Sequence, residues 1–408
     1  MPQIIIIGGG AAGFFAAITC AQTHPDTRVT LLEAGKYPLA KVKISGGGRC
    51  NVTHACFEPT QLVQYYPRGH KALRGAFTRF QPQDTVAWYA DRGVKLKTEA
   101  DGRMFPTTDD SDTIVRCLMD AAAAAGVKIW TGEAVAEIAP QQPAGWHVSL
   151  KSGQVLTADR VLLATGSNPS AHKWAQQLGH PLATPVPSLF TFNIPDPRLT
   201  NLAGVSVKSA TVKLATTGKN ALTQTGALLI THWGVSGPAV LKLSSWGARL
   251  LAEARYKTTL IVDWLPEYRP DKLRELILAV KSQLPQKTIQ NSCPVPIPHR
   301  LWESLTSHIG IQASDRWAGL ANKTLDRLIQ ELNRGEYQIT GKGVFKEEFV
   351  TCGGVDLKSV NFQTMESKIC PGLYFAGEIL DIDGVTGGFN FQSAWTTGYL
   401  AGMAMGEG

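Results

Sequence analysis

The sequence is poor in charged residues and has no long apolar run. Charged residues make up 18% of its 408 residues and apolar residues 44%, a balance typical of a folded globular protein that excludes a disordered chain. Its apolar runs fall short of the roughly 18 residues that a membrane-spanning helix needs. The first residues, MPQIIIIGGG, have neither the basic region nor the long apolar core of a secretory signal. From these absences we predict a cytoplasmic protein without a membrane segment.

Cysteine is scarce, and its spacing suggests no pairing. The seven cysteines stand at positions 20, 50, 56, 117, 293, 352 and 370, with no CxxC pair and no His/Cys cluster at zinc spacing. This pattern predicts neither a redox disulfide nor a metal site. An odd number of cysteines is typical of reduced thiols in a cytoplasm.

Glycine, in contrast, is abundant. The chain has 40 glycines, many of them in short runs, and such runs occur where the backbone must approach a ligand closely. This favours a nucleotide cofactor. A chain of 408 residues also exceeds what one hydrophobic core usually serves, so we expect two domains.

The order of strand and helix patterns predicts an α/β protein with an insertion. The first part alternates strands at 4–7, 28–33, 127–130, 146–150 and 160–163 with helices at 11–21, 83–92 and 111–125. After Pro185 the pattern changes to antiparallel strands at 189–194, 205–214 and 227–230, followed by two or more helices within 270–332. Buried-strand patterns return at TCGGV, from position 351, and at LYFAGE, from position 373.

These patterns predict a discontinuous domain. We expect residues 1–190 and 345–408 to form one Rossmann-like, dinucleotide-binding domain built from both ends of the chain. Residues 191–344 would form an inserted lobe on the substrate side, rich in strands over 191–265 and helical over 266–335.

A glycine-rich turn follows the first predicted strand. Gly8, Gly10 and Gly13 have the GxGxxG spacing, which allows a tight turn, close approach to a pyrophosphate and close packing of helix on strand, in that order. The helix that begins there favours negative phosphates at its N-terminus. Glu33 stands 20 residues after Gly13, at the end of the second strand, where a carboxylate can bind ribose hydroxyls. The spacing predicts a bound dinucleotide.

The C-terminal segment indicates that this dinucleotide is FAD rather than NAD. A buried strand pattern ends at Gly377, and Asp381 follows where it can bind a ribityl hydroxyl. Gly387 and Gly388 then open a helix predicted over 389–402, whose first N–H groups can face the electron-rich N1/O2 edge of the flavin and stabilise its anionic reduced form. An ordinary glycine turn before a terminal helix is the alternative.

Two further observations concern the cofactors. LLATG at 162–166, at the end of another buried strand, resembles the ATG element of flavoproteins with two dinucleotide-binding domains. No second GxGxxG separates these segments, so we expect no NAD(P)H-binding domain within the chain. NAD(P)H would then visit transiently in a ping-pong cycle: it reduces the flavin, leaves, and the substrate takes hydride in the same cleft.

Positive charge is concentrated early in the chain. The formal net charge is +7, and residues 36–80 alone hold eight basic residues against the single acid Glu58. Aromatic residues are interleaved with them: Tyr37, Phe57, Tyr65, Tyr66, Phe77 and Phe80. Exposed, such side chains can hold the phosphates and stack the bases of RNA. Alternatively, some of the basic residues serve the cofactor's pyrophosphate and the aromatic rings are core.

The run KISGGGRCNVTH at 43–54 is the most distinctive in the sequence, and with it the chain resembles the BaiN/RdsA flavoprotein family. The resemblance covers nearly the whole chain and includes GGGAAG at 8, SGGGRCN at 45, GRMFP at 102, LLATG at 162, THWGVSGPAVLKLS at 231, TCGGV at 351 and the C-terminal AGEILDIDGVTGGFNFQSAWTTG. It implies an FAD domain with an inserted lobe of β-barrel and helices.

In that picture residues 45–51 wrap a tightly but non-covalently bound FAD, and no residue binds a metal. The expected FAD contacts are Gly8, Gly10, Ala12, Gly13, Glu33, Ala34, Lys41, Ser45, Gly46, Gly47, Cys50, Asn51, Val135, Ala164, Thr165, Gly166, Gly377, Glu378, Asp381, Gly387, Gly388, Phe389 and Asn390.

Three residues are candidates for catalysis. Cys50 can protonate a substrate carbon or tune the flavin, or it can be a small packed residue. Arg49 can anchor a phosphate or the flavin, or it can be an ion-pair partner. His232 precedes a helix predicted to begin at Pro238 and can donate the proton that an enolate needs after hydride transfer. A core histidine near a helix-capping Ser236 is the alternative.

Three functions are compatible with these features. The preferred one is reduction of uracil in ribosomal RNA to dihydrouridine, which the resemblance implies for the RdsA branch and which the basic segment 36–80 favours. The second is reduction of a small conjugated carbonyl compound, as the resemblance implies for the BaiN branch with steroid-like bile acid intermediates. The third is a flavin-bearing RNA-binding or assembly factor with little turnover.

Overall fold

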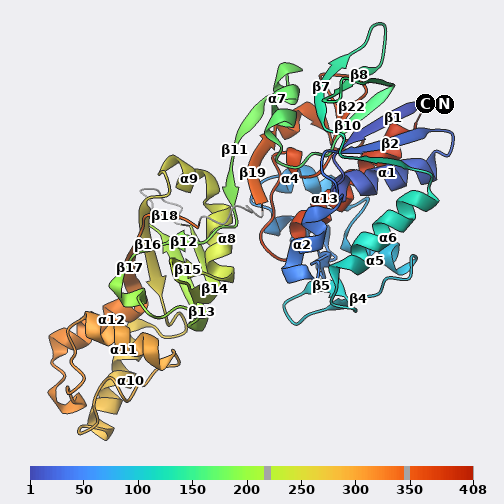
Figure 1. Cartoon of the computed structure of the whole chain (residues 1–408). Helices are drawn as coiled ribbons and strands as arrows, with labels where there is room; N and C mark the ends of the chain where they lie inside the picture. Colours follow the sequence, from blue (N-terminus) through green and yellow to red (C-terminus); the bar gives the residue numbers. More distant parts are fainter. Residues whose placement is uncertain (216–221, 344–349, 408) are drawn as a thin grey trace. The chain divides into compact units, whose positions relative to one another are not determined.

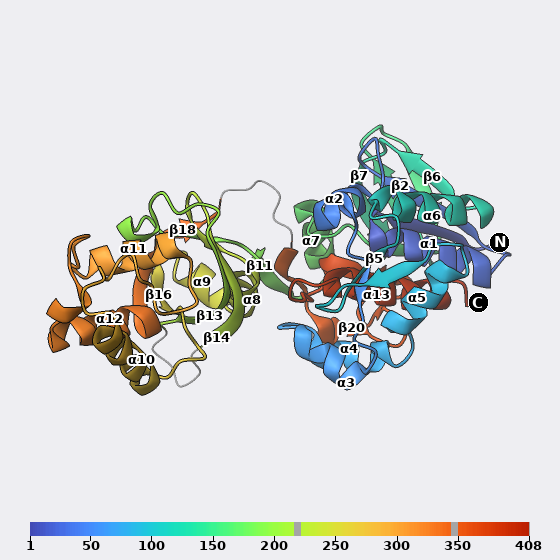
Figure 2. The same cartoon turned by 90° about the horizontal axis from the view of Figure 1, so that it is seen from below.

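The computed structural model describes residues 1–215, 222–343 and 350–407, and it divides into two units (Figures 1 and 2). One unit combines the two ends of the chain, Met1–Val186 and Val350–Gly408, and the other is the intervening Pro187–Phe349. We call them the Rossmann unit and the inserted unit. The boundaries expected from the sequence, near 190 and 345, lie a few residues from these.

A mostly parallel sheet organises the Rossmann unit, in the strand order β20-β21-β22-β10-β1-β2-β6. Its strands are β20 (Val360–Asn361), β21 (Glu366–Ser367), β22 (Leu373–Phe375), β10 (Arg160–Leu163), β1 (Gln3–Ile7), β2 (Arg28–Glu33) and β6 (Lys128–Thr131). The apolar run of β1 is buried, as a strand covered on both faces requires. β1 runs parallel to β2 on one side and to β10 on the other. This reversal of strand order leaves a crevice beside the end of β1.

Two helices from opposite ends of the chain pack together in the Rossmann unit: α1 (Ala11–Thr23) and α13 (Phe389–Met405). A Cβ on Gly398 would lie 2.5 Å from the carbonyl oxygen of Ala12, and one on Gly402 would lie 2.6 Å from that of Ala16. The helices therefore approach too closely for a side chain at either glycine. The two termini of the chain lie near each other in both views (Figures 1 and 2).

Smaller sheets and further helices surround the central sheet. The sheets are β3 (Thr53–His54) with β5 (Arg103–Pro106) and β4 (Leu96–Thr98); β7 (Val135–Pro140) with β8 (Trp146–Leu150) and β9 (Val155–Ala158); and β11 (Leu182–Ser188) with β19 (Val350–Val355). The helices are α2 (Ala40–Gly48), α3 (Pro59–Leu62), α4 (His70–Phe77), α5 (Pro82–Ala90), α6 (Ser111–Ala124) and α7 (Pro169–Gln177). The strand predicted at TCGGV is β19, and it pairs with β11 rather than joining the central sheet.

An antiparallel sheet forms one part of the inserted unit, in the order β17-β16-β13-β14-β15-β12-β18. Its strands are β12 (Phe192–Asn193), β13 (Ser206–Leu214), β14 (Thr223–Ile230), β15 (Gly234–Ser236), β16 (Thr258–Asp263), β17 (Gly335–Ile339) and β18 (Gly341–Lys342). The edge strands β17 and β18 are separated in the chain by Thr340 alone. The sheet must therefore curl until its edges approach, which gives a barrel-like shape.

Helices form the rest of the inserted unit: α8 (Pro238–Trp246), α9 (Ala248–Glu253), α10 (Pro270–Gln283), α11 (His299–His308) and α12 (Asn322–Arg334). Trp302 on α11 and Trp317 are fully buried, with ring centroids 6.4 Å apart, in a core separate from that of the Rossmann unit. Each unit thus has its own hydrophobic core. Within the described ranges, no helix combines the length and apolar character needed to cross a membrane.

Two local predictions in the inserted unit are wrong. The strand expected over 189–194 is reduced to β12, because Leu189 adopts a left-handed φ of 58° and the N–H of Phe190 donates to Ser244 Oγ at 3.0 Å. The turn expected between Gly234 and Gly237 contains β15, which pairs with β12 and β14. In both places a tertiary contact overrides the local pattern.

Candidate functional site

The segments predicted to bind a dinucleotide meet at one edge of the central sheet. The parallel strands β1, β2, β10 and β22 end there, each followed by one of these segments. A Cβ on Gly8 would lie 2.4 Å from the carbonyl oxygen of Ala164, and one on Gly166 would lie 3.6 Å from Glu378 Oε2. Segments more than 150 residues apart in the chain are thus neighbours at the crevice beside β1, where open α/β sheets bind their ligands.

The glycine-rich turn leaves space at the start of α1. Gly10 is the N-cap of this helix, and a Cβ placed on it would meet no atom within 4 Å. A Cβ on Gly13 would lie 2.0 Å from the carbonyl oxygen of Gly8, so helix and strand pack too closely for a side chain there. Open backbone at a helix N-terminus fits a pyrophosphate, because the N–H groups and the helix dipole attract negative charge.

Glu33 is held at the end of β2 by the backbone. Its carboxylate accepts hydrogen bonds from the N–H groups of Gly9 at 2.8 Å and Gly35 at 2.6 Å. The N–H of Glu133 donates to the carbonyl of Glu33 at 3.0 Å, which brings the start of β7 and the buried Val135 to the same region. Such a fixed carboxylate is suited to ribose hydroxyls. Ala34, the next residue, is exposed.

The neighbouring strand ends supply further polar groups. Thr165 Oγ1 is buried and has no hydrogen-bond partner among the described residues, as expected of a group that a ligand satisfies. Lys41 forms an ion pair with Glu378 at 2.8 Å, and the other oxygen of this carboxylate accepts from the N–H of Thr351 at 2.8 Å. The N–H of Asp381 donates to the carbonyl of Val355 at 3.0 Å. These residues fit a dinucleotide with phosphates and several hydroxyl groups.

The SGGGRCN segment leaves helix α2 through a kink. Ser45, Gly46 and Gly47 depart from helical angles, and the positive φ continues at Gly48 and Cys50. A Cβ on Gly47 or Gly48 would meet nothing within 4 Å, so this backbone faces open space. A loop of this kind can lie against a flat ring, because no side chain keeps the ring away.

This loop is joined to the start of α13. With its amide oriented to satisfy both partners, Asn51 accepts from the N–H of Gly388 at 3.0 Å and donates to the carbonyl of Thr53 at 3.1 Å. The Asn390 side chain, predicted to touch the cofactor, instead bonds both backbone groups of Gly384, at 2.8 and 2.9 Å. The structure therefore brings together the two segments predicted to hold the flavin ring, although they are more than 330 residues apart.

Sequence reasoning missed an aromatic stack and a buried network at this junction. Phe389 stacks on Tyr65, with centroids 4.3 Å apart, and on His54 at 4.6 Å. Gln392 Oε1, fully buried, accepts from Thr53 Oγ1 at 2.6 Å and from Thr85 Oγ1 at 2.9 Å. Only the polar residues within the apolar helix 389–402 could have signalled this network, and nothing in the sequence pairs Tyr65 with Phe389.

Cys50 and Arg49 are engaged by the protein itself. The Cys50 side chain is fully buried, and this burial raises the pKa of its thiol to about 12. Arg49 forms ion pairs with Glu99 at 2.7 Å and Asp109 at 3.4 Å, and its guanidinium lies 4.0 Å from the centre of the Phe105 ring. These contacts favour the packed-residue and ion-pair interpretations. They also join SGGGRCN to the GRMFP motif.

The basic segment 36–80 is neither wholly exposed nor wholly buried. Tyr66, Phe77 and Phe80 are core residues, so the stacking interpretation is wrong for them, whereas Tyr37 and Phe57 are exposed. Several of its basic side chains have acidic partners within the Rossmann unit: Lys41 with Glu378, Lys43 with Asp112, Arg49 with Glu99 and Arg68 with Asp383.

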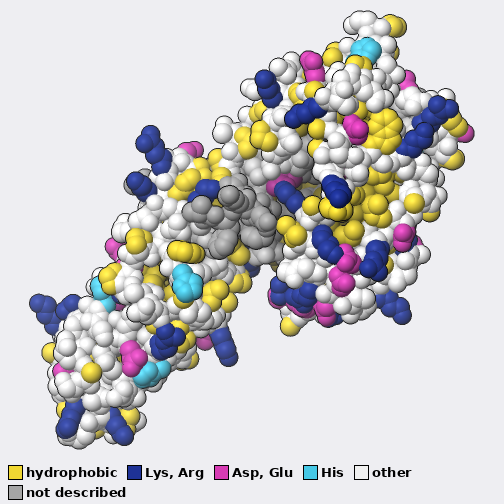
Figure 3. Space-filling view, in the orientation of Figure 1, with side chains coloured by type: hydrophobic (Ala, Val, Ile, Leu, Met, Phe, Trp, Pro, Cys, Tyr) yellow, Lys and Arg dark blue, Asp and Glu magenta, His cyan; other side chains and the backbone are white. Residues whose placement is uncertain are grey.

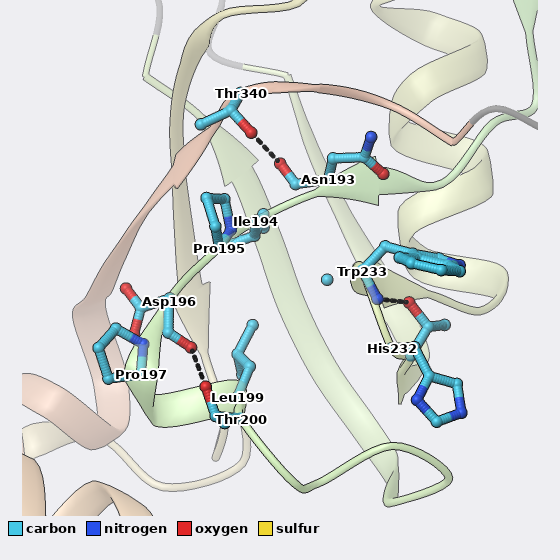
Figure 4. A pocket seen from close by; sticks show the side chains of 12 residues that line it. Asn193, Ile194, Pro195, Asp196, Pro197, Leu199, Thr200, His232, Trp233 and Thr340 are labelled. Carbon is cyan, nitrogen blue, oxygen red and sulfur yellow. Dashed lines mark hydrogen bonds between the residues drawn. The ribbon is translucent and has the colours of Figure 1, made fainter.

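His232 belongs to the inserted unit, where it lines a cavity of about 490 Å³ (Figure 4). Its side chain is exposed, so the alternative of a core histidine is wrong. Gly237, not Ser236, is the N-cap of α8, because the sharp bend falls one residue later, and the capping alternative is wrong as well. Trp233 and His232 lie opposite Pro195, Pro197 and Leu199 across this cavity (Figure 4).

Three comparisons with known proteins place this geometry. A model of the HI0933-like protein Rossmann domain matches residues 2–404. The chain is 31% identical to a 3-dehydro-bile acid delta(4,6)-reductase of Clostridium scindens, over 100% of both chains. It is 30% identical to the ribosomal RNA dihydrouridine synthases of Haemophilus influenzae, with 98% of each chain covered, and of Escherichia coli, with 97% of this chain and 96% of the other covered.

Solved structures show the same fold. The chain resembles 3-ketosteroid-delta4-(5alpha)-dehydrogenase from Rhodococcus jostii RHA1, with a TM-score of 0.51, 14% identity, and 100% of this chain and 97% of that chain covered. At such an identity the likeness concerns the fold alone. The predicted Rossmann-like, FAD-binding α/β fold is confirmed.

Proposed function

The chain belongs to the HI0933-like family of Rossmann-domain proteins, and from this premise we propose that it is an FAD-dependent oxidoreductase that reduces a conjugated C=C bond. Dihydrouridine is uridine whose C5=C6 bond has gained two hydrogens, so the names of the curated relatives all describe reduction of a C=C bond. Their alignment over at least 96% of both chains supports the proposal.

FAD fits the residues gathered at the strand ends. The open backbone at Gly10 would take the pyrophosphate, Glu33 the ribose hydroxyls, and the loop 45–51 with the start of α13 the flavin ring. The buried hydroxyl of Thr165 would gain the partner that the protein does not give it. When bound, FAD supplies hydride transfer, with NAD(P)H as the visiting reductant.

The preferred substrate is uracil in ribosomal RNA. The net reaction adds one hydride and one proton across C5=C6 of the base and oxidises NAD(P)H to NAD(P)⁺. The observation that carries this choice is the 30% identity to two ribosomal RNA dihydrouridine synthases over nearly the full length of the chains. A formal net charge of +7 also suits a polyanionic partner.

We propose His232, rather than Cys50, as the proton donor. His232 is exposed in the cavity of the inserted unit, where a substrate can reach its imidazole. Cys50 is fully buried, and with a pKa raised to about 12 its thiol gives up a proton reluctantly. His232→Gln should therefore lower the rate of substrate reduction much more than Cys50→Ala, while both variants keep their flavin.

Reduction of a small enone is the second candidate, favoured by the 31% identity to the bile acid reductase. The two substrates are separated by single-turnover assays. Protein reduced anaerobically with NAD(P)H is mixed with ribosomal RNA that lacks dihydrouridine, or with a steroid enone, and reoxidation of the flavin is followed. Reoxidation by the RNA supports the proposal, and reoxidation by the enone alone replaces it with the second candidate.

A further inference from the structure

The cavity of about 490 Å³ lies on the unit that carries the excess positive charge. The inserted unit has 20 Lys and Arg against 13 Asp and Glu, whereas the Rossmann unit has 20 of each. The whole formal net charge of +7 therefore belongs to the inserted unit. Lys and Arg side chains are spread over its visible face, at the lower left of Figure 3. A polyanion is attracted to such a surface without regard to sequence.

Trp233 offers an open aromatic face in this cavity. Its side chain is 62% exposed, whereas Trp264, Trp302 and Trp317 of the same unit are buried. Its main chain is fixed, because its carbonyl accepts from the N–H of Ile194 at 2.8 Å and its N–H donates to Thr231 Oγ1 at 3.4 Å. An indole held on a fixed backbone and left open to solvent is suited to stacking on a flat ligand.

The opposite wall is rigid. Pro195 and Pro197 have fixed backbone φ angles, and Leu199 packs into the core behind them. Arg198 secures this wall through buried ion pairs with Asp196 at 2.7 Å and Glu331 at 2.8 Å. Because the wall is already ordered, a ligand loses little entropy in ordering it.

Polar groups between the walls suit the edge of a base. Thr231, Thr340 and His232 line the cavity with two hydroxyl groups and an imidazole, which can both donate and accept hydrogen bonds. The imide of uracil presents one N–H between two carbonyl oxygens and needs such mixed partners. A steroid skeleton would leave these groups unpaired, at a cost in affinity.

We propose that this cavity is a nucleobase-binding site, in which a uracil of single-stranded RNA stacks on Trp233 while neighbouring phosphates meet the Lys and Arg side chains of the inserted unit. The proposal rests on the proposed function and deepens it by assigning the contact with the base. The size of the cavity, about 490 Å³, is sufficient for a pyrimidine nucleoside.

The test is binding of a fluorescein-labelled oligouridylate to the flavin-loaded, full-length protein and its variants. Trp233→Leu should weaken binding about 5- to 150-fold, since stacking on one aromatic ring is worth about 1–3 kcal/mol. Trp233→Phe should recover part of the loss. Trp246→Leu, at an exposed tryptophan outside the cavity lining, is the matched control and should bind like the parent protein.

The other outcomes are decisive as well. Unchanged binding by Trp233→Leu, with normal circular dichroism and flavin content, overturns the proposal. So does quenching of Trp233 fluorescence by a steroid enone but not by the oligouridylate. Dihydrouridine formation is measured separately in ribosomal RNA. If oligouridylate binding depends on Trp233 but no dihydrouridine is formed, the base-binding site stands and the proposed reaction fails.

Discussion

At Gly10 the fold and the cofactor make different demands. A Cβ there meets no atom within 4 Å, so the protein itself tolerates a side chain. We expect Gly10→Val to fold with nearly unchanged stability but to lose its flavin, because the added methyl groups occupy the space of the pyrophosphate. Flavin absorbance of the purified variant and its thermal unfolding measure the two effects.

Gly13→Val is the matched control for this change. A Cβ at Gly13 would lie 2.0 Å from the carbonyl oxygen of Gly8, so this variant should fail to fold whether or not flavin is present. A folded Gly10→Val protein that stays yellow would contradict the placement of the pyrophosphate.

Cys50 provides a pH-dependent test of burial. Burial raises the pKa of its thiol from 9.0 to about 12, so the folded state holds the proton more tightly than the unfolded chain does. Its contribution to stability is complete below pH 9.0 and is lost as the pH rises toward about 12. Stability of the parent protein should therefore fall more steeply than that of Cys50→Ala over this range, by at most about 1.4 kcal/mol per pH unit.

Urea unfolding of both proteins at a series of pH values measures this difference. The comparison cancels the titration of lysines, tyrosines and the other buried cysteines, which both proteins share. Parallel stability curves above pH 9.0 would show that Cys50 ionises as freely in the folded protein as in the unfolded chain.

At the scale of elements, the packing of α1 on α13 brings the C-terminal segment to the glycine-rich turn. Gly398→Ala would place a methyl carbon 2.5 Å from the carbonyl oxygen of Ala12, and we expect a destabilisation of about 1–3 kcal/mol. Gly75→Ala, on the exposed side of α4 with open space around it, should stabilise by about 0.5–1 kcal/mol. Chemical denaturation should therefore give opposite signs for the same substitution, and a neutral Gly398→Ala would contradict the close approach.

Elements with a strong local pattern could be predicted, and contacts between distant segments could not. The strands predicted at 146–150 and 160–163 are confirmed as β8 and β10, and the predicted start of a helix at Pro238 is confirmed in α8. The bond between Asn51 and Gly388 has no local signature, because it depends on how α13 packs. The same holds for Phe190, whose N–H bonds a serine on α8 and ends the expected strand.

At the scale of the whole molecule, the sequence misplaces the functional positive charge. Residues 36–80 are strongly basic as a stretch, but acids from distant parts of the Rossmann unit pair with them, as Asp112 does with Lys43 and Asp383 with Arg68. The inserted unit has no such balance, and its excess of basic residues appears once the two units are separated. Net charge could thus be counted from the sequence, but its location required the fold.

The central claim is that the chain reduces uracil in ribosomal RNA. The most direct measurement is the dihydrouridine content of ribosomal RNA, mapped by nucleotide, from cells with and without the protein, followed by treatment of the deficient RNA with purified protein, FAD and NAD(P)H. The account predicts that dihydrouridine is lost at one nucleotide and restored in vitro by the parent protein. Unchanged dihydrouridine in the deficient cells would contradict it.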